Sequence, residues 1–168
     1  MDLRKAILKE HSKKQCSRIV HWVGNHPERF DQLMRLFLTG EYRVTQRAAW
    51  PLSYCVLDHP ELIQPHIPAL LTHLQKPNLH NAVKRNAVRL LQGMDLPKKY
   101  EGRVMTLCMD YLASPNEPVA VKAFSLKVLE RLSQKYPEIL PEIKYLILDQ
   151  LPRQTAAFKV RARPFLNS

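Results

Sequence analysis

Apolar residues recur along this chain at helical spacing, in blocks that are each long enough for a helix. One pattern occurs three times, in residues 77–91, 115–129 and 152–166. It begins with Pro and a polar residue. After any four residues come an apolar residue and Lys, after any two more a small residue, and after any three more Leu. The apolar, small and Leu positions are four apart and share one helical face. Each copy therefore predicts a turn followed by a helix, with a small residue where a neighbouring helix approaches closely.

The three copies follow a fixed period. Lys84, Lys122 and Lys159 are 38 and 37 residues apart, and the prolines that begin the copies have the same spacing. Another apolar block of helix length precedes each copy, at residues 63–74, 104–112 and 139–151. No segment has the alternating pattern of a strand bounded by hairpin turns. A period of this size is typical of stacked repeats, and the unit it predicts is helix, turn, helix.

A fourth copy can be traced upstream with substitutions. Gly40 stands in place of the proline, Arg47 lies 37 residues before Lys84, and Trp50 stands in place of the small residue. Pro51 then follows inside the predicted helix, which we expect it to kink or interrupt. Residues 14–23 are a candidate for the second helix of a fifth copy.

These features resemble the HEAT-repeat family of armadillo-like helical repeats. The residues that carry the resemblance are Asn78, Val83, Lys84, Ala87 and Leu91, and in the next copy Asn116, Val121, Lys122, Ser125 and Leu129. The resemblance implies an all-α fold, a right-handed α-solenoid of about five antiparallel helical hairpins with a period of 37–38 residues. In that family the polar turn residue and the basic residue form ladders along the solenoid, and Glu41 and Arg153 break the polar ladder at its two ends.

The expected organisation is a single domain of 168 residues. Turns at X-Pro pairs divide it into an N-terminal helical pair or cap at 1–26 and repeats at 27–59, 60–96, 97–136 and 137–168. The last helix is expected at residues 156–166. No repeat follows it, so Phe165 and Leu166 are expected to be exposed or docked on a partner.

Composition fits a helical protein of the cytoplasm. Most of the thirteen prolines fall at predicted helix starts and ends. The longest apolar runs are too short to span a membrane, and the N-terminus lacks the apolar core of a secretory signal. Cys16, Cys55 and Cys108 are isolated and odd in number, so we expect reduced, partly buried thiols.

The net charge of +11 allows two interpretations. Basic side chains on the second helices are placed to contact phosphates on a concave face. They also suit packing between repeats, with their stems on apolar surface. The candidate binding residues are Arg47, Trp50, Lys84, Arg85, Arg89, Lys122, Lys127, Lys159, Arg161 and Arg163.

Candidate chemistry is sparse. His59, His66, His73 and His80 are seven residues apart, which on a helix is about 10.5 Å and too far for shared zinc ligation. Nucleotide-binding, zinc-protease and serine-hydrolase motifs are absent, and no cofactor or metal is predicted. Some HEAT-like DNA glycosylases use an Asp and aromatic residues in a basic cleft. That resemblance makes Asp58 or Asp110, with Trp50, the nearest equivalents.

The sequence therefore favours a non-catalytic binding or adaptor module whose second helices receive a protein partner. The alternative is a nucleic-acid-binding protein that uses the basic second helices. A third hypothesis is an enzyme of the DNA glycosylase type. The pattern predicts no particular oligomeric state.

Overall fold

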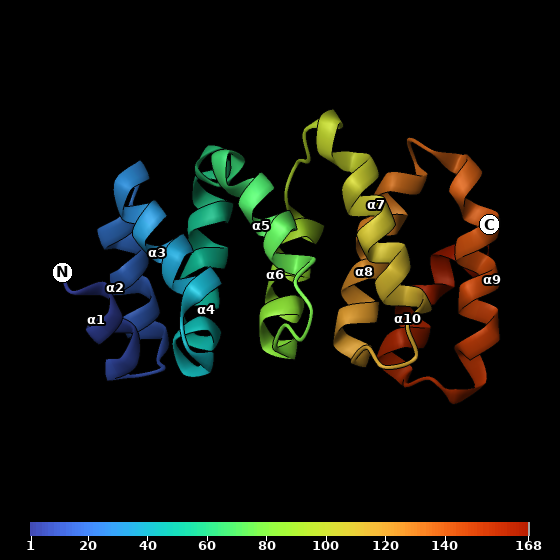
Figure 1. Ribbon diagram of the computed structural model, residues 1–168, viewed down its shortest axis with the longest axis horizontal. Coiled ribbons are helices and arrows are strands. Elements are labelled where there is room, and N and C mark those ends of the chain that lie inside the picture. The colour runs from blue at the N-terminus through green and yellow to red at the C-terminus, as the bar shows by residue number, and fades with distance from the viewer. Residues whose placement is uncertain (168) are drawn as a thin grey trace. The chain divides into compact units, whose positions relative to one another are not determined.

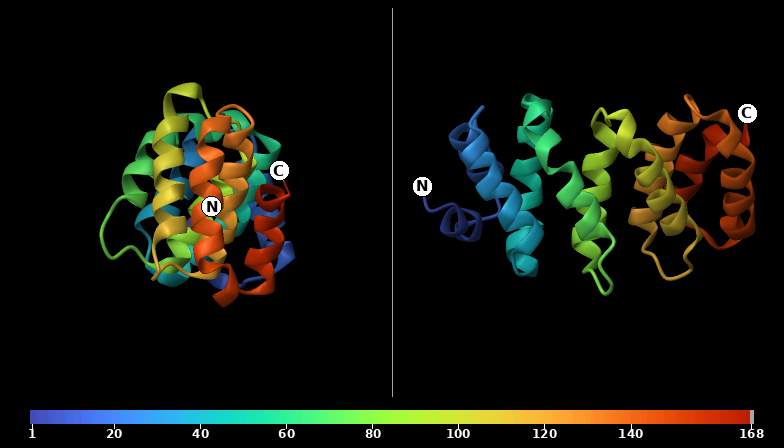
Figure 2. Two further views of the ribbon diagram at one scale, coloured as in Figure 1. Left: turned by 90° about the vertical axis from the view of Figure 1, so that its right-hand side faces the viewer. Right: turned by 45° about the horizontal axis from the view of Figure 1, so that its top comes forward.

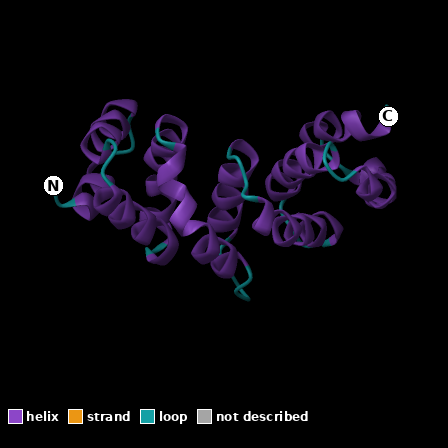
Figure 3. Ribbon diagram, turned by 90° about the horizontal axis from the view of Figure 1, so that it is seen from above, coloured by secondary structure: helices purple, strands orange, loops and turns teal. Residues whose placement is uncertain are grey.

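The computed structural model describes residues 1–167, which are helical in every regular element (Figure 3). The chain forms two compact units, Met1–Asp95 and Leu96–Ser168. The all-helical prediction is therefore confirmed over the described residues. No helix among them is long and apolar enough to cross a membrane.

The helices of each unit are labelled in Figure 1. The first unit contains α1 (Leu3–Lys9), α2 (Lys13–Val23), α3 (Pro27–Thr39), α4 (Tyr42–Asp58), the 3₁₀ helix η1 (Pro60–His66), α5 (Ile67–Leu74) and α6 (Asn81–Gly93). The second unit contains α7 (Lys98–Ala113), α8 (Val119–Ser133), the 3₁₀ helix η2 (Pro137–Ile139), α9 (Leu140–Gln150), the 3₁₀ helix η3 (Leu151–Arg153) and α10 (Ala156–Leu166).

Helices of the first unit pack in two layers. α4 packs against α2 on one side and α6 on the other, and we call these three the second-helix layer. α1 and α3 pack against each other, and α3 contacts η1, so these elements form the other layer. Within a pair such as α3 and α4, the two helices lie side by side (Figure 2). The layering leaves one face of α2, α4 and α6 without a covering helix from this unit.

A buried triad recurs in the second helices. Its members are an apolar residue, a small residue and Leu at four-residue spacing, and each is buried: Val44, Ala48 and Leu52; Val83, Ala87 and Leu91; Val121, Ser125 and Leu129. The predicted close-approach positions are therefore confirmed in α6 and α8. In α10, Ala162 is likewise buried.

The predicted register of the fourth copy was wrong. Ala48, and not Trp50, is the buried small residue of α4, so the offset from α6 is 39 residues rather than 37. Thr45 thereby takes the position of Lys84. Its buried hydroxyl donates to the carbonyls of Phe37 and Gly40, each at 3.1 Å.

Pro51 does not interrupt its helix. α4 runs unbroken over 17 residues with Pro51 buried inside it. Burial of Val44, Ala48 and Leu52 on one face holds the helix together across the missing N–H, since most helical stability in proteins comes from packing. The prediction of an interruption at this point is therefore corrected.

The second unit is built around α8, which packs against α7 and α10. Phe158 and Phe165 of α10 are both buried, and Leu166 is half-buried. The expectation that Phe165 is exposed or docked on a partner was wrong. Phe158, Ala162 and Phe165 lie on one helical face, and α8 and α9 cover it within the chain.

Asn78 and Asn116 lie in turns, as predicted. Asn78 has a φ of 57°, in the left-handed region that Asn tolerates better than most side chains. Neither residue caps the following helix. That role in α6 belongs to His80, whose Nδ1 accepts from the N–H of Ala82 at 3.1 Å.

Candidate functional site

Positive charge gathers on the second-helix layer of the first unit. α2, α4 and α6 together hold eight Lys or Arg residues and a single acid, Asp58. In contrast, α1, α3, η1 and α5 together hold five basic and three acidic residues. The first turns of α3 and η1 each contain an acid, whereas those of α1, α2, α4 and α6 contain none. The layer therefore presents a strongly basic face.

Two large apolar side chains stand out from this layer near the C-terminal end of α4. Leu57 is 75% exposed and Tyr54 is 42% exposed. They are three residues apart, so they lie on one face of the helix about one turn from each other. We call this pair the α4 ridge.

One groove runs along the α2 side of the ridge. It has a volume of about 490 Å³ and lies between α2 and the C-terminal half of α4. Its lining residues are Lys13, Cys16, Ser17, Val20, His21, Gly24, Tyr54, Cys55, Asp58 and His59. The small Ser17 of α2, and Gly24 directly after the helix, leave this space open beside Tyr54.

A second groove runs along the α6 side. It has a volume of about 380 Å³, and its lining residues are Ser53, Val56, Leu57, Pro60, Arg89, Leu90, Gln92, Gly93, Met94 and Asp95. Gly93 helps to open it, because a Cβ added there would meet no heavy atom within 4 Å. The ridge thus stands between two grooves that are each large enough to take an apolar side chain.

The cysteines beside the ridge are structural. Cys16 and Cys55 line the α2 groove from below, and both are free and buried. Burial, with a smaller effect from the nearby Asp58 charge, raises the pKa of the Cys55 thiol to about 12. Burial likewise raises the pKa of Cys16. These thiols stay protonated at neutral pH and act as small apolar groups in the floor of the groove.

The candidate binding residues of the first unit divide between structural and exposed positions. Arg47 donates from Nη1 to the carbonyl of Leu8 at 2.8 Å, which ties α4 to α1. Trp50 contacts the ring of His11 with centroids 5.1 Å apart and lines a cavity of only about 10 Å³. Lys84 and Arg85 are half-buried on α6, and Arg89 is exposed in the α6 groove.

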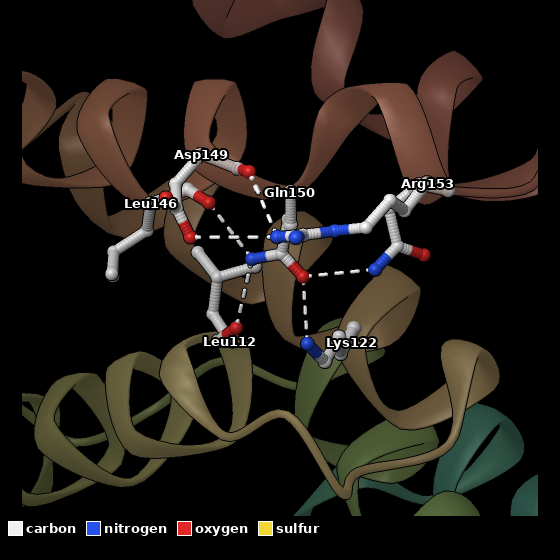
Figure 4. A network of polar contacts seen from close by, with 7 residues as sticks. Leu112, Lys122, Leu146, Asp149, Gln150 and Arg153 are labelled. Carbon is white, nitrogen blue, oxygen red and sulfur yellow. Dashed lines mark hydrogen bonds and ion pairs between the residues drawn. The ribbon is translucent and has the colours of Figure 1, made fainter.

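In the second unit, Lys122 is in the interior rather than on an open face. It is 5% exposed, and Nζ donates to Oε1 of Gln150 at 2.6 Å (Figure 4). Burial lowers the pKa of this lysine, against a smaller opposing effect of Glu117. The hydrogen bond of Lys122 therefore joins α8 to α9 inside this unit.

The other basic candidates of the second unit lie nearer the surface. Lys127 pairs with Glu130 one turn away at 2.8 Å. Lys159 and Arg163 are exposed on α10, and Arg161 is half-buried there. The lysines of the three sequence copies thus have three different environments.

The evenly spaced histidines have separate structural partners. His66 pairs with Asp31 at 2.8 Å, and His59 lies 3.5 Å from Glu61. His80 caps α6, and burial lowers the pKa of His73. Among residues 1–167, no three His, Cys, Asp or Glu side chains are grouped as metal ligands.

The residues suggested by the glycosylase resemblance do not form one site in the first unit. Asp58 lines the α2 groove, whereas Trp50 lines the separate small cavity beside His11. They are eight positions apart on α4, which is about 12 Å along the helix axis. Asp110 is exposed on α7 of the other unit.

Sequence reasoning missed Leu57, the most exposed large apolar residue of the α4 ridge. The signal that finds it is the buried stripe Val44, Ala48 and Leu52, which continues to Cys55 and leaves Leu57 on another face. Reading that stripe depends on the correct register of α4, which the predicted offset of 37 residues obscured.

A family model described as HEAT repeat domain matches residues 3–163. No curated protein and no solved structure matches the chain.

Proposed function

Because the chain belongs to the HEAT repeat domain family, we propose that it is a non-catalytic binding module whose second-helix layer in the first unit receives a protein partner. The observation that carries this proposal is the α4 ridge. Leu57 is 75% exposed and Tyr54 is 42% exposed near the C-terminal end of α4, and a groove lies on each side of the pair. Pockets that take anchor side chains of a partner, beside an exposed tyrosine, are features of protein interfaces.

The wider architecture in this proposal is a right-handed α-solenoid of about five antiparallel hairpins. The period of 37–38 residues and the recurring buried triads support it. The proposed repeats are 27–59, 60–96, 97–136 and 137–168, preceded by a helical pair or cap at 1–26. The three free cysteines fit a reducing compartment, and we place the protein in the cytoplasm.

A nucleic-acid partner is the second candidate. The eight basic residues of α2, α4 and α6 favour it, because phosphate contacts dominate such binding. The apolar ridge favours protein, since a phosphate backbone gains nothing from an exposed leucine. Lys127, Lys159, Arg161 and Arg163 in the second unit remain candidates for either partner.

Affinity capture from extract of the native cell tests the proposal. Three baits are compared. They are the wild-type chain and two variants with a Leu→Asp change, Leu57→Asp on the ridge and Leu148→Asp on α9. Both leucines are exposed, at 75% and 57%, so neither change disturbs the core. We expect a protein that wild type and Leu148→Asp retain and Leu57→Asp loses.

The proposal fails if all three baits retain the same proteins. It also fails if the retained material is nucleic acid that nuclease releases and that Leu57→Asp still binds. Circular dichroism and melting of each bait verify that the variants are folded before capture.

A further inference from the structure

The charge around the α4 ridge indicates what kind of protein segment fits it. We infer that the ridge and its two grooves bind an acidic segment that carries two apolar anchor side chains. This inference rests on the proposed function and adds the chemistry of the partner. It follows from three features of the first unit, which are the spacing of the grooves, their apolar floor and the charge at their edges.

The spacing of the grooves sets the spacing of the anchors. Packed helices lie about 8–10 Å apart, so the gap between α2 and α4 and the gap between α4 and α6 are separated by about 9 Å. An α-helix rises about 1.5 Å per residue, and side chains seven residues apart share one face at about 10.5 Å, so a helical partner reaches both grooves with anchors seven residues apart. One anchor side chain then fills each groove, with the ridge between them.

The floors of the grooves suit apolar anchors. The α2 groove ends on buried Cys16 and Cys55, and the α6 groove ends on buried Leu90 and Met94. Anchors that enter them also cover Leu57 and remove its apolar surface from water. Burial of apolar surface is the main favourable term in protein association.

Each groove has one basic residue and one acid among its lining residues. Lys13 lines the α2 groove and Arg89 lines the α6 groove, and Arg85 lies one turn before Arg89. Asp58 and Asp95 line the C-terminal ends of the same grooves. Acidic side chains of a partner are therefore attracted toward Lys13, Arg85 and Arg89 and repelled from the two Asp residues, which sets where along the grooves they lie.

Nucleic acid fits these features less well. A continuous phosphate chain would meet Asp58 and Asp95 as well as the basic residues, and it has no group to cover Leu57. An acidic protein segment uses both the charge and the apolar surface. We therefore argue for the protein and treat nucleic acid as an outcome of the test.

A displayed library of random 16-residue peptides is the probe. It is selected on the wild-type chain after removal of peptides that bind Leu57→Asp. We expect the selected sequences to be enriched in Asp and Glu and to carry two large apolar residues seven positions apart. Arg89→Glu should weaken binding of the selected peptides by about tenfold or more, whereas Arg35→Glu, on α3 in the other layer, should leave it unchanged.

Several outcomes would overturn the inference. One such outcome is that the selected peptides are apolar without an acidic bias and that their binding is lost in Leu57→Asp. This result would refute the acidic partner and leave the proposed function standing. A second outcome is that no peptide is enriched on wild type relative to Leu57→Asp. If affinity capture still depends on Leu57, this result also refutes the acidic partner and leaves the proposed function standing. If duplex DNA instead binds at physiological salt, with a steep salt dependence that Leu57→Asp does not change, both the inference and the proposed function are wrong.

Discussion

The ammonium group of Lys122 donates a hydrogen bond of 2.6 Å to Oε1 of Gln150. The amide nitrogen of the same Gln150 donates to the carbonyl of Leu112 at 3.0 Å and to that of Leu146 at 2.8 Å (Figure 4). One side chain of α9 thereby connects α8 with the C-terminal turn of α7. A lysine that the sequence presents as a candidate phosphate ligand is instead part of the packing of this unit.

Lys122→Ala tests that structural role. The change removes a buried donor to Gln150 and its packed stem, so we expect a loss of unfolding free energy of roughly 1–3 kcal/mol. The matched control is Lys159→Ala, which changes the equivalent lysine of the next copy at an exposed position and should stay within about 0.5 kcal/mol. Urea denaturation of both variants measures the difference, and equal midpoints would contradict the account.

Substitution of two glycines by alanine should change the stability of the protein in opposite directions. A Cβ at Gly40 would lie 2.3 Å from the carbonyl oxygen of Leu36 and 2.9 Å from Cγ1 of Val44. Gly40→Ala should therefore destabilise by roughly 1–3 kcal/mol through overpacking. A Cβ at Gly102, in α7, would meet nothing within 4 Å, so Gly102→Ala should stabilise by roughly 0.5–1 kcal/mol. Thermal melting decides the signs, and a shift of both variants in one direction would contradict the packing described.

Ala87→Arg tests the close-approach position of α6. Ala87 is fully buried, so the arginine would be overpacked and its charge left without a partner. We expect a loss of roughly 3 kcal/mol or more, or failure to fold. Ala157→Arg, on the exposed face of α10, is the control and should leave the melting temperature nearly unchanged. Similar melting of the two variants would show that the register of the buried triad is wrong.

Glu101 should make the second unit sensitive to acid. A hydrogen bond from Lys135, with a smaller effect from one donated by Tyr136, lowers the pKa of this buried carboxyl below its usual 4.5. A lowered pKa means that the contribution of Glu101 to stability is present above pH 4.5. This contribution is lost as the pH falls through the lowered pKa that Glu101 has in the folded state.

Glu101→Gln should therefore melt below wild type at pH 7. The gap between the two melting temperatures should narrow as the pH is lowered from 4.5 toward 3, because wild type loses the ionised form that the variant lacks. Calorimetry over this pH range gives the comparison. A gap that stays constant with pH would show that the ionised carboxylate contributes nothing.

The sequence predicts those parts of the fold that depend on its repeating pattern. The triads Val83, Ala87 and Leu91, and Val121, Ser125 and Leu129, follow from spacing alone, because apolar positions four apart share a helical face. The end of α10 at Leu166 is predicted for the same reason. The register of α4 is not predicted correctly. Arg47 is conspicuous in the sequence, but it is two residues past Thr45, which is the true equivalent of Lys84.

Burial of the repeated lysines cannot be read from the motif. Lys122 and Lys159 occupy the same place in the pattern, yet one is buried and the other is exposed. The difference arises because Gln150, 28 residues further along the chain, closes over Lys122. A motif describes local spacing, whereas burial depends on which distant element packs above it.

The grooves beside the α4 ridge also lie outside what a pattern predicts. They exist where side-chain volume is missing, at residues such as Ser17, Gly24 and Gly93. The charge division between the layers is visible in the sequence only once the helices have been assigned to layers. This explains why the basic residues were predicted as a binding face while Leu57 was missed.

Site-specific photo-crosslinking is the most direct test of the central claim that the α4 ridge docks a protein. A benzophenone side chain replaces Leu57 in one sample and Leu148 in the other, and both are irradiated in extract of the native cell. The account predicts a discrete protein adduct from position 57 that is absent from position 148. No adduct at position 57, or an adduct there that nuclease digests, would contradict it.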